Sequence, residues 1–331
     1  MYTLKKSCRQ IINNMNKKVV YITGCLGFIG SYVTRECLKL GWYVCGVDKI
    51  TYAANPKLLA EFHDLYGDRF KFIHDDINNL TSLYDCDYVI NLAAETHVDN
   101  SIVESKSFLH SNINGVHNLL ELVKSKNKFK MPTLVHFSTD EVYGDITEGA
   151  HTESDLLKPS NPYSATKAAA DMLVLAWART FNVPYVIIRP TNNYGSGQYV
   201  EKLIPKTCKL LHLGKQIPLH NNGTPRRVWL HAQDTANAVI SIISKNATNE
   251  IFNISGNYEA ENIEIIRKLV YLIKHDDDIN KYCDFTYSRD GQDLRYSLDD
   301  KKLRNIGWRN KINIDKILPS IVEYYKNNFI W

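Results

Sequence analysis

Two short segments carry the side chains best suited to chemistry. Tyr163 lies four residues before Lys167, which places both side chains on one face of a helix, one turn apart. A lysine ammonium beside a phenol favours the phenolate and lowers a pKa that normally lies near ~10. Such a pair can take the proton of an alcohol while the alcohol is oxidised to a ketone.

A second acid–base pair lies in the segment Ser138-Thr139-Asp140-Glu141-Val142-Tyr143-Gly144. Alcohol oxidation does not need these carboxyl groups. Removal of water does, because one group must take a proton from carbon and another must protonate the departing hydroxyl. Proximity can hold two carboxyl groups in opposite protonation states. An isolated Asp-Glu pair after a strand is more often a cap or a solvated turn, but its place between Thr139 and Tyr163 favours catalysis.

A candidate dinucleotide site lies near the N-terminus. Residues 19–30 predict a strand, a G-x-x-G-x-x-G turn and the start of a helix. The glycines allow a tight turn and let a pyrophosphate approach the N–H groups of the helix N-terminus. The residues expected to bind the cofactor here are Gly24, Gly27, Phe28, Ile29 and Gly30.

Asp48 ends the second predicted strand. A carboxylate at this position can accept hydrogen bonds from ribose hydroxyls and repel a 2′-phosphate. Asp48 therefore predicts NAD rather than NADP, although Lys49 next to it weakens the electrostatic preference. The alternative is that Asp48 is only a turn residue.

These side chains need a scaffold that brings them together. The first half of the chain alternates short apolar runs with helical patterns, which is typical of βαβ units and a parallel sheet. The predicted strands are residues 19–23, 43–47, 70–74, 88–92, 133–138 and 185–188. The predicted helices are residues 29–40, residues 108–124 and a long helix that begins after Pro162.

After Pro190 the alternation weakens, and Asn, Gly and Pro become frequent. We expect a flexible tail over residues 1–16, an NAD-binding domain over 17–190 and a mainly substrate-binding domain over 191–331. Residues 228–230 and 251–254 predict strands, and the segment 228–255 is expected to return to the first domain. The predicted fold is α/β, with a Rossmann-type doubly wound parallel sheet and a smaller C-terminal α/β substrate domain.

The composition excludes several functional classes. The 331 residues are 44% hydrophobic and 23% charged, with a net charge of +4, which is too small and scattered to indicate nucleic acid binding. No apolar run approaches the ~20 residues that span a bilayer, and residues 1–16 contain no apolar h-region, so we expect no secretory signal there. The seven cysteines form no C-x-x-C pair, so we expect no metal site, no disulfide framework and a reducing, cytoplasmic compartment.

From about Lys17 to the C-terminus, the chain resembles the extended short-chain dehydrogenase/reductase family, and within it the nucleotide-sugar 4,6-dehydratases. The most specific segment is 139–144, because the sugar epimerases of the same superfamily usually have small residues at the positions of Asp140 and Glu141. The resemblance implies an NAD-dependent enzyme that converts dTDP-glucose or UDP-glucose to the 4-keto-6-deoxy sugar. It also implies a homodimer formed through two long helices, and a first step toward rhamnose or other deoxysugars.

The resemblance implies a role for each catalytic residue. Tyr163 would take the C4 hydroxyl proton while a hydride passes to NAD, and Thr139 would position that hydroxyl. Glu141 would then take the C5 proton and Asp140 would protonate the departing C6 hydroxyl. Lys167 would hold the nicotinamide ribose and bias Tyr163 toward the phenolate.

Further contacts are implied by the same resemblance. The cofactor would also contact Asp76, Ile77, Ala93, Ala94 and Asn193. The substrate or cofactor would contact His97, Asn192, Lys202 and Leu203, and the diphosphate would contact Arg227, Asn262 and Arg289. Guanidinium groups suit phosphate oxygens, although single arginines are more often surface charges, and the alternative role for His97 is that of a structural histidine.

The chain departs from the family pattern near the predicted nucleotide site. Val228 stands where the bacterial dTDP-glucose enzymes usually have Asp, and Ser196, Val200 and Asp290 stand where Pro is usual. The segment His97-Val98-Asp99-Asn100-Ser101 and the missing Asp after Arg227 lean slightly toward the UDP-glucose dehydratase domain of plant rhamnose synthases. Thymine and uracil differ by one methyl, worth only ~1–3 kcal/mol in a pocket, so the base stays open.

Two other functions remain as alternatives. A nucleotide-sugar 4-epimerase of the same superfamily would need no acid–base pair at Asp140 and Glu141. A catalytically silent NAD-binding regulator or scaffold would need neither Tyr163 nor Lys167.

Overall fold

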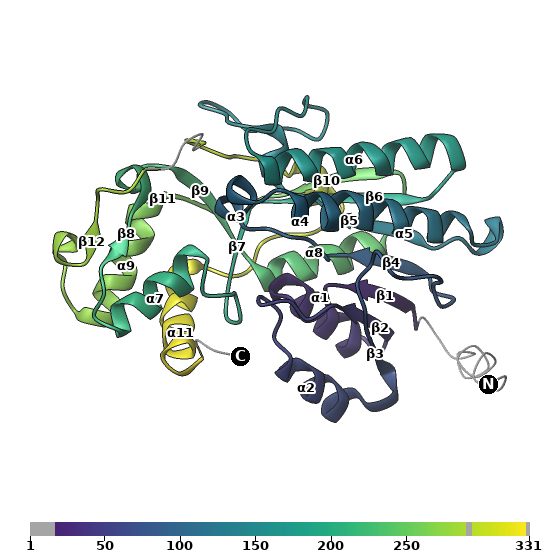
Figure 1. The fold of residues 1–331 in the computed structure, drawn as a ribbon, viewed down its shortest axis with the longest axis horizontal. Helices are drawn as coiled ribbons and strands as arrows, with labels where there is room; N and C mark the ends of the chain where they lie inside the picture. The colour runs from purple at the N-terminus through teal and green to yellow at the C-terminus, as the bar shows by residue number, and fades with distance from the viewer. Residues whose placement is uncertain (1–16, 289–292, 329–331) are drawn as a thin grey trace.

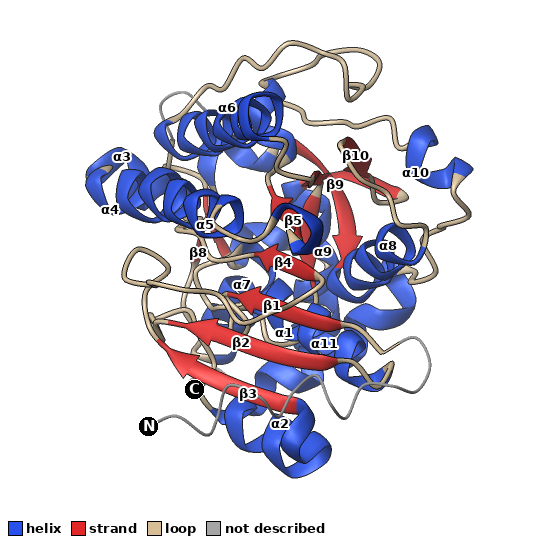
Figure 2. Ribbon diagram, turned by 90° about the vertical axis from the view of Figure 1, so that its right-hand side faces the viewer, coloured by secondary structure: helices blue, strands red, loops and turns tan. Residues whose placement is uncertain are grey.

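The computed structural model describes residues 17–288 and 293–328. A seven-stranded parallel sheet forms its centre, with the strand order β10-β6-β5-β4-β1-β2-β3 (Figures 1 and 2). These strands are β1 (Val19–Thr23), β2 (Tyr43–Asp48), β3 (Phe70–His74), β4 (Tyr88–Asn91), β5 (Thr133–Phe137), β6 (Tyr185–Pro190) and β10 (Glu250–Ile254). The predicted fold class is confirmed, and each predicted strand of this sheet ends within two residues of the observed one.

The central strands form because they are buried on both faces. In β1, Val20 and Ile22 face one hydrophobic cluster, and Tyr21 between them faces another. Such strands are nearly continuous apolar runs rather than alternating ones. The first cluster includes side chains of α1 and α8, and the second includes side chains of α5 and α6, so helices cover both faces of the sheet.

The helices follow the strands in alternation over the first half of the chain (Figure 1). Their bounds are α1 (Phe28–Lys39), α2 (Lys57–Tyr66), α3 (Val98–Val103), α4 (Lys106–Phe108), α5 (Gly115–Lys124), α6 (Pro162–Phe181), α7 (Leu203–His212), α8 (Ala232–Ser244), α9 (Asn262–Lys274), α10 (Lys301–Asn305) and α11 (Ile314–Asn327). Helix α6 begins with a capping box, in which the Asn161 side chain accepts from Ser164 N, and Pro162 takes the first helical position.

The predicted helix over residues 108–124 is wrong in one respect. A π-helical segment, Leu109–Asn114, separates α4 from α5. Within it Asn112 is buried, and its amide nitrogen donates to Glu95 O (3.0 Å) and Thr166 Oγ1 (2.9 Å), while its oxygen accepts from Glu95 N (2.9 Å). π-helical turns of this kind often lie at functional sites. The apolar pattern could not reveal it, since Phe108 and Val116 stay on the core side of the helix.

The C-terminal half adds two small sheets beside the large one, at the left of Figure 1. A three-stranded sheet contains β7 (Asn192–Tyr194), β9 (Arg226–His231) and β11 (Tyr258–Glu261), and a two-stranded sheet contains β8 (Ile217–Pro218) and β12 (Cys283–Asp284). Side chains of α7, α9 and α11 pack with these strands in a separate hydrophobic cluster.

The chain crosses between the two parts more than once. Residues 228–230 lie in β9 of the small sheet, whereas residues 251–254 lie in β10, which pairs with β6 at the edge of the large sheet. Helix α8, between these two strands, packs with α1 on the large sheet.

Within the two described ranges, no helix is long and apolar enough to cross a membrane. The six cysteines in those ranges are free thiols, and no cluster of His, Cys, Asp and Glu there is arranged to hold a metal ion.

Candidate active site

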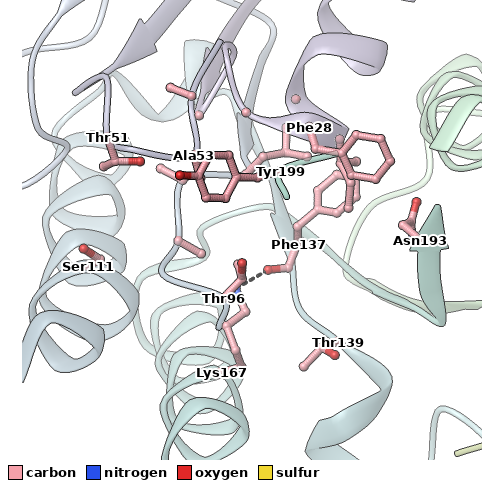
Figure 3. Close-up of a pocket in the computed structure, with 18 of the residues that line it drawn as sticks. Phe28, Thr51, Ala53, Thr96, Ser111, Phe137, Thr139, Lys167, Asn193 and Tyr199 are labelled. Atoms are coloured by element: carbon pink, nitrogen blue, oxygen red, sulfur yellow. Dashed lines mark hydrogen bonds between the residues drawn. The ribbon is translucent and has the colours of Figure 1, made fainter. Parts of the chain in front are cut away.

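A cavity of about 310 Å³ opens where the strands of the large sheet end at their carboxyl side. Most of the sequence-predicted site residues line it (Figure 3). They are Gly24, Gly27, Phe28, Ile29, Gly30, Asp48, Asp76, Ile77, Ala93, Ala94, Thr139, Asp140, Glu141, Tyr163, Lys167, Asn192, Asn193 and Lys202. This edge of an open α/β sheet is where such folds bind ligands.

The turn after β1 has no space for a side chain at Gly24 or Gly30. Gly24 has φ of +67°, and a Cβ there would lie 2.8 Å from Ala93 N. A Cβ on Gly30 would lie 1.9 Å from Gly24 O, so α1 begins in direct contact with the turn. The N-terminal residues of α1 therefore face the cavity, which fits the pyrophosphate of a dinucleotide.

Asp48 is held in place by two backbone N–H groups. Its carboxylate accepts from Leu26 N (3.0 Å) and Ile50 N (2.8 Å). Burial raises the pKa of Asp48, and these hydrogen bonds oppose the rise. The Lys49 ammonium donates to Ser111 Oγ (3.1 Å) and lies 3.4 Å from Asp76 Oδ2, so its charge faces other acidic groups. Asp48 and the glycine turn together fit the adenosine ribose and pyrophosphate of NAD.

Tyr163 and Lys167 are both buried on the cavity side of α6. The Lys167 ammonium donates to Phe137 O at 2.5 Å (Figure 3). Burial lowers the pKa of Lys167 to about 8, against the raising effect of Asp171. The expected lowering of the Tyr163 pKa is not found: burial and the charge of Glu141 raise it, and a hydrogen bond with Thr139 only partly opposes them. Burial of the phenol is the largest of these effects.

Asp140 and Glu141 lie in a 3₁₀ turn, Asp140–Tyr143, that directly follows β5. Thr139 caps this turn: its Oγ1 accepts from Glu141 N (3.3 Å) and donates to Asp140 Oδ1 (3.1 Å). The Asp140 side chain is buried, and its Oδ2 has no hydrogen-bond partner within the described ranges. Burial, with the charge of Glu141, raises the pKa of Asp140 to about 7.

Glu141 has a different environment from its neighbour. Burial raises its pKa, but the guanidinium of Arg227 and a hydrogen bond from Asn161 Nδ2 (3.3 Å) oppose the rise. One carboxyl group is thus set to hold its proton near neutral pH, and the other has partners that favour its charged form.

Arg227 does not line the cavity but lies behind Glu141. It is buried, with its guanidinium 4.4 Å from the centre of the Tyr296 ring and its Nη2 donating to Asp293 O (3.1 Å). Arg289, the second predicted phosphate arginine, falls outside the described residues.

Three other predicted residues lie away from the cavity wall. His97 caps α3 and accepts from Asn100 N (3.3 Å), which is the contact of a structural histidine. Leu203 begins α7 and packs against the smaller hydrophobic cluster, and Asn262 begins α9, where its N–H donates to Pro225 O (3.1 Å).

Lys202 and Asn193 line the cavity with their polar atoms already paired. Lys202 Nζ donates to Thr96 O (2.9 Å), which joins the two parts of the chain across the cavity. Asn193 Oδ1 accepts from Thr235 Oγ1 (2.6 Å), and Asn193 Nδ2 donates to Thr191 O (2.9 Å).

Sequence analysis missed several residues of this site. Tyr199 lies beside Ala53 in Figure 3, and its ring meets that of Tyr52 edge-on at 5.3 Å. Loop residues of this kind carry no spacing pattern. Others had a usable signal, because Leu92 and Ser138 are the last residues of two predicted strands, Thr191 directly follows β6, and the carboxyl ends of parallel strands meet at one edge.

Comparisons with known proteins agree with this geometry. Residues 21–321 match the family model described as GDP-mannose 4,6 dehydratase. The chain is 37% identical to the dTDP-glucose 4,6-dehydratase of Haemophilus influenzae, over 93% of this chain and 98% of that protein. It is 36% identical to a trifunctional UDP-glucose 4,6-dehydratase of Arabidopsis thaliana, over 95% of this chain but 48% of that protein. The crystal structure of DesIV, a dTDP-glucose 4,6-dehydratase from Streptomyces venezuelae with NAD bound, superposes with a TM-score of 0.87 at 33% identity, over 94% of this chain and 97% of that one.

Proposed function

Because this chain belongs to the GDP-mannose 4,6 dehydratase family, we propose that it removes water from a nucleoside-diphosphate glucose. The chain is an NAD-dependent nucleotide-sugar 4,6-dehydratase, a hydro-lyase like its relatives. The observation that carries this function is the joint placement of two acid–base pairs, Tyr163 with Lys167 and Asp140 with Glu141, on one cavity.

When bound, NAD would take up a hydride from the sugar and give it back to the same sugar. The glycine turn and Asp48 would hold its pyrophosphate and adenosine ribose, and Lys167 would hold the nicotinamide ribose. Tyr163 would accept the proton of the C4 hydroxyl, which Thr139 would orient by a hydrogen bond.

Oxidation at C4 makes the C5 proton acidic, because the resulting carbanion is stabilised as an enolate. Glu141 would take this proton, since its partners Arg227 and Asn161 favour the charged carboxylate. Asp140 would protonate the departing C6 hydroxyl, since its raised pKa keeps it protonated near neutral pH. Burial raises the pKa of both carboxyl groups, and at Glu141 the charge of Arg227 and the hydrogen bond from Asn161 oppose the rise.

The substrate would extend from Asp140 toward the smaller part of the molecule. Lys202 and Asn192 line that side of the cavity, and Arg227 lies behind Glu141. We propose Lys202, Asn192, Arg227, Leu203, His97, Asn262 and Arg289 as the substrate side, with dTDP-glucose or UDP-glucose as the substrate. In domain terms, residues 17–190 would serve NAD and residues 191–331 mainly the nucleotide sugar; of the segment 228–255, α8 and β10 cross back to the large sheet, whereas residues 228–230 stay in the small one.

The experiment is to incubate the protein with dTDP-glucose and UDP-glucose in parallel and to analyse the products by mass spectrometry. Loss of one water without accumulation of reduced nicotinamide is expected, and the faster substrate identifies the base. A hexose isomer of unchanged mass would instead make the protein a 4-epimerase. Cofactor binding without turnover of any nucleotide sugar would make it a silent regulator.

We also propose a homodimer formed through the outer side of α6. Apolar side chains are exposed there, with Met172 48% and Phe181 41% exposed, and Ile102 and Val103 on the adjacent α3 are exposed as well. Figure 2 shows α3, α4, α5 and α6 together on one side of the sheet. Light scattering should give a mass twice that of the chain. Met172→Lys should reduce this mass to that of a single chain.

The product would be a 4-keto-6-deoxyglucose nucleotide, which leads toward rhamnose or other deoxysugars. The trifunctional plant relative supports the first of these. We place the protein in a reducing, cytoplasmic compartment, in keeping with the free thiols of the described cysteines.

A further inference from the structure

Asp171 of α6 belongs to a group of buried polar side chains behind the cavity, and none of the steps above uses this group. Tyr163, Lys167 and Asp171 recur every four residues and therefore lie on one face of α6. The first two line the cavity, whereas Asp171 is fully buried and is not among the lining residues.

Asp171 is paired with Arg189 of β6. Both Nε and Nη2 of Arg189 lie 2.9 Å from Asp171 Oδ2, and the Arg189 side chain is 2% exposed. Its remaining nitrogen, Nη1, donates to the hydroxyl of Tyr143 (2.7 Å). Tyr143 in turn donates to Asn253 Oδ1 in β10 (2.8 Å).

Tyr143 is the last residue of the 3₁₀ turn that begins at Asp140. The outer side of this turn is held by Lys158 N, which donates to Val142 O (3.0 Å). At Gly144 a Cβ would lie 2.4 Å from Lys158 O, so the chain leaves the turn in tight contact with the loop that contains Lys158. Arg189 thus links the helix of Tyr163 and Lys167 to the turn of Asp140 and Glu141.

Stability alone is a weak reason for such a link. The desolvation of a buried ion pair offsets much of its attraction, and apolar side chains of similar volume often serve as well. A guanidinium does provide fixed donor directions, which hold two partners in one geometry. Catalytic groups need such precision, because a displacement of ~1 Å can cost ~100-fold in rate.

We propose that Arg189 is a positioning residue for the reaction, holding α6 and the acid–base turn in register through Asp171 and Tyr143. This inference rests on the proposed dehydratase function. Oxidation at C4 uses Tyr163 and Lys167 of α6, with only Thr139, which caps the turn, on the other side of the link. Elimination needs Asp140 and Glu141 placed against the same sugar, so a loosened link slows elimination more than oxidation.

The test is Tyr143→Phe, which removes the hydroxyl between Arg189 and the turn but keeps the Asp171–Arg189 pair. We expect kcat to fall by about 10- to 100-fold with the KM for the nucleotide sugar unchanged. During turnover a larger fraction of the enzyme should hold reduced nicotinamide, seen by its absorbance, because oxidation then outruns elimination. Arg189→Lys, which keeps a cation beside Asp171 but loses the fork, should show the same shift.

The matched control is Tyr21→Phe. Tyr21 is equally buried in β1, and its hydroxyl has no hydrogen-bond partner in the described part of the chain. It should leave kcat, KM and the reduced fraction as in the parent protein. Melting curves of all variants show whether each is folded at the assay temperature.

Two outcomes would overturn the inference. In the first, Tyr143→Phe has the same kcat as the parent protein. In the second, kcat falls only as much as the amount of folded protein falls, and the fraction of enzyme that holds reduced nicotinamide is unchanged. Either leaves the proposed function standing if the parent protein dehydrates its substrate. A parent protein that makes no 4-keto-6-deoxy product refutes the proposed function, and the role of Arg189 falls with it.

Discussion

Asp140 and Glu141 are adjacent in the chain, yet their carboxyl groups meet different surroundings. Among the described residues Asp140 Oδ2 is buried without a hydrogen-bond partner, whereas the Glu141 carboxylate accepts from Asn161 Nδ2, and the charge of Arg227 opposes the rise in the pKa of both groups that burial causes. The proposed division of labour between acid and base would then come from where the 3₁₀ turn points each side chain, because both residues carry a carboxyl group.

Asp140→Asn should lower kcat by about 10²- to 10⁴-fold, because an amide cannot protonate the departing hydroxyl. In the parent protein kcat should fall as the pH rises through about 7, where Asp140 loses its proton. The variant should lack this limb. Rates of product formation across pH measure both, and a variant that keeps the limb would assign the acid elsewhere.

The same group makes stability depend on pH. The unfolded chain releases the Asp140 proton near pH ~4, whereas the folded protein keeps it to about 7. The folded state binds more protons between these values, so its stability falls as the pH rises through this window, by at most ~4 kcal/mol. Asp140→Asn should therefore be more stable than the parent at pH ~8 by denaturant unfolding and comparable to it at pH ~4.

Among the elements, the turn between β1 and α1 has no space for a side chain at Gly30. Gly30→Ala would place a Cβ 1.9 Å from Gly24 O, so α1 must move away from the cavity. We expect NAD affinity to weaken by at least about tenfold, or ~1.4 kcal/mol, in a calorimetric titration. Gly27→Ala, whose Cβ would lie 3.3 Å from the same oxygen, should cost less, and equal losses would contradict this account.

The π-helical segment is held in place by the hydrogen bonds of one side chain, that of Asn112. Asn112→Ala removes three hydrogen bonds and leaves both polar groups of the Glu95 backbone without their partner. We expect a loss of about 2–4 kcal/mol in the free energy of unfolding. The matched control is Asn114→Ala in the same segment, where the side chain is exposed. Equal stability of the two variants would show that Asn112 does not hold the segment.

The elements also show what sequence analysis can and cannot predict. The buried strands were predictable because runs such as Val20–Ile22 are apolar on both faces, and the glycine turn because its spacing is local. The π-helical segment, the raised Tyr163 pKa and the place of Arg227 behind Glu141 depend on contacts between residues far apart in the chain. Asp171 and Arg189 lie 18 positions apart in the chain, and no periodicity relates a helix to the strand that follows it.

At the scale of the whole molecule, helix α11 contacts the loop 195–198, which leads to the cavity. Tyr325 of α11 donates to Gly195 O (3.2 Å) and Gln198 O (2.7 Å), and Tyr32 of α1 donates to Ser196 O (3.0 Å). This loop leads directly to Tyr199 and Lys202 at the cavity.

Tyr325→Phe should therefore raise the KM for the nucleotide sugar by about five- to tenfold while kcat changes little, since the one hydroxyl proton shared by the two loop carbonyls contributes ~1 kcal/mol. Steady-state kinetics measures the split. Tyr324→Phe on the neighbouring residue, whose ring packs edge-on against Tyr325, is the control. A fall in kcat at constant KM would place the effect on the chemistry instead.

The position of β10 has a consequence for how this protein is made. Strand β6 is complete at Pro190, but its partner β10 ends only at Ile254, after the chain has built β7 and β9 of the other part. A growing chain thus leaves the ribosome with the apolar edge of β6 unpaired until β10 follows. Open edges of this kind pair with other chains, so the large sheet is exposed to aggregation during synthesis. Its folding is completed only when most of the chain has been synthesised, and a protein cut after residue 190 would keep that edge permanently open.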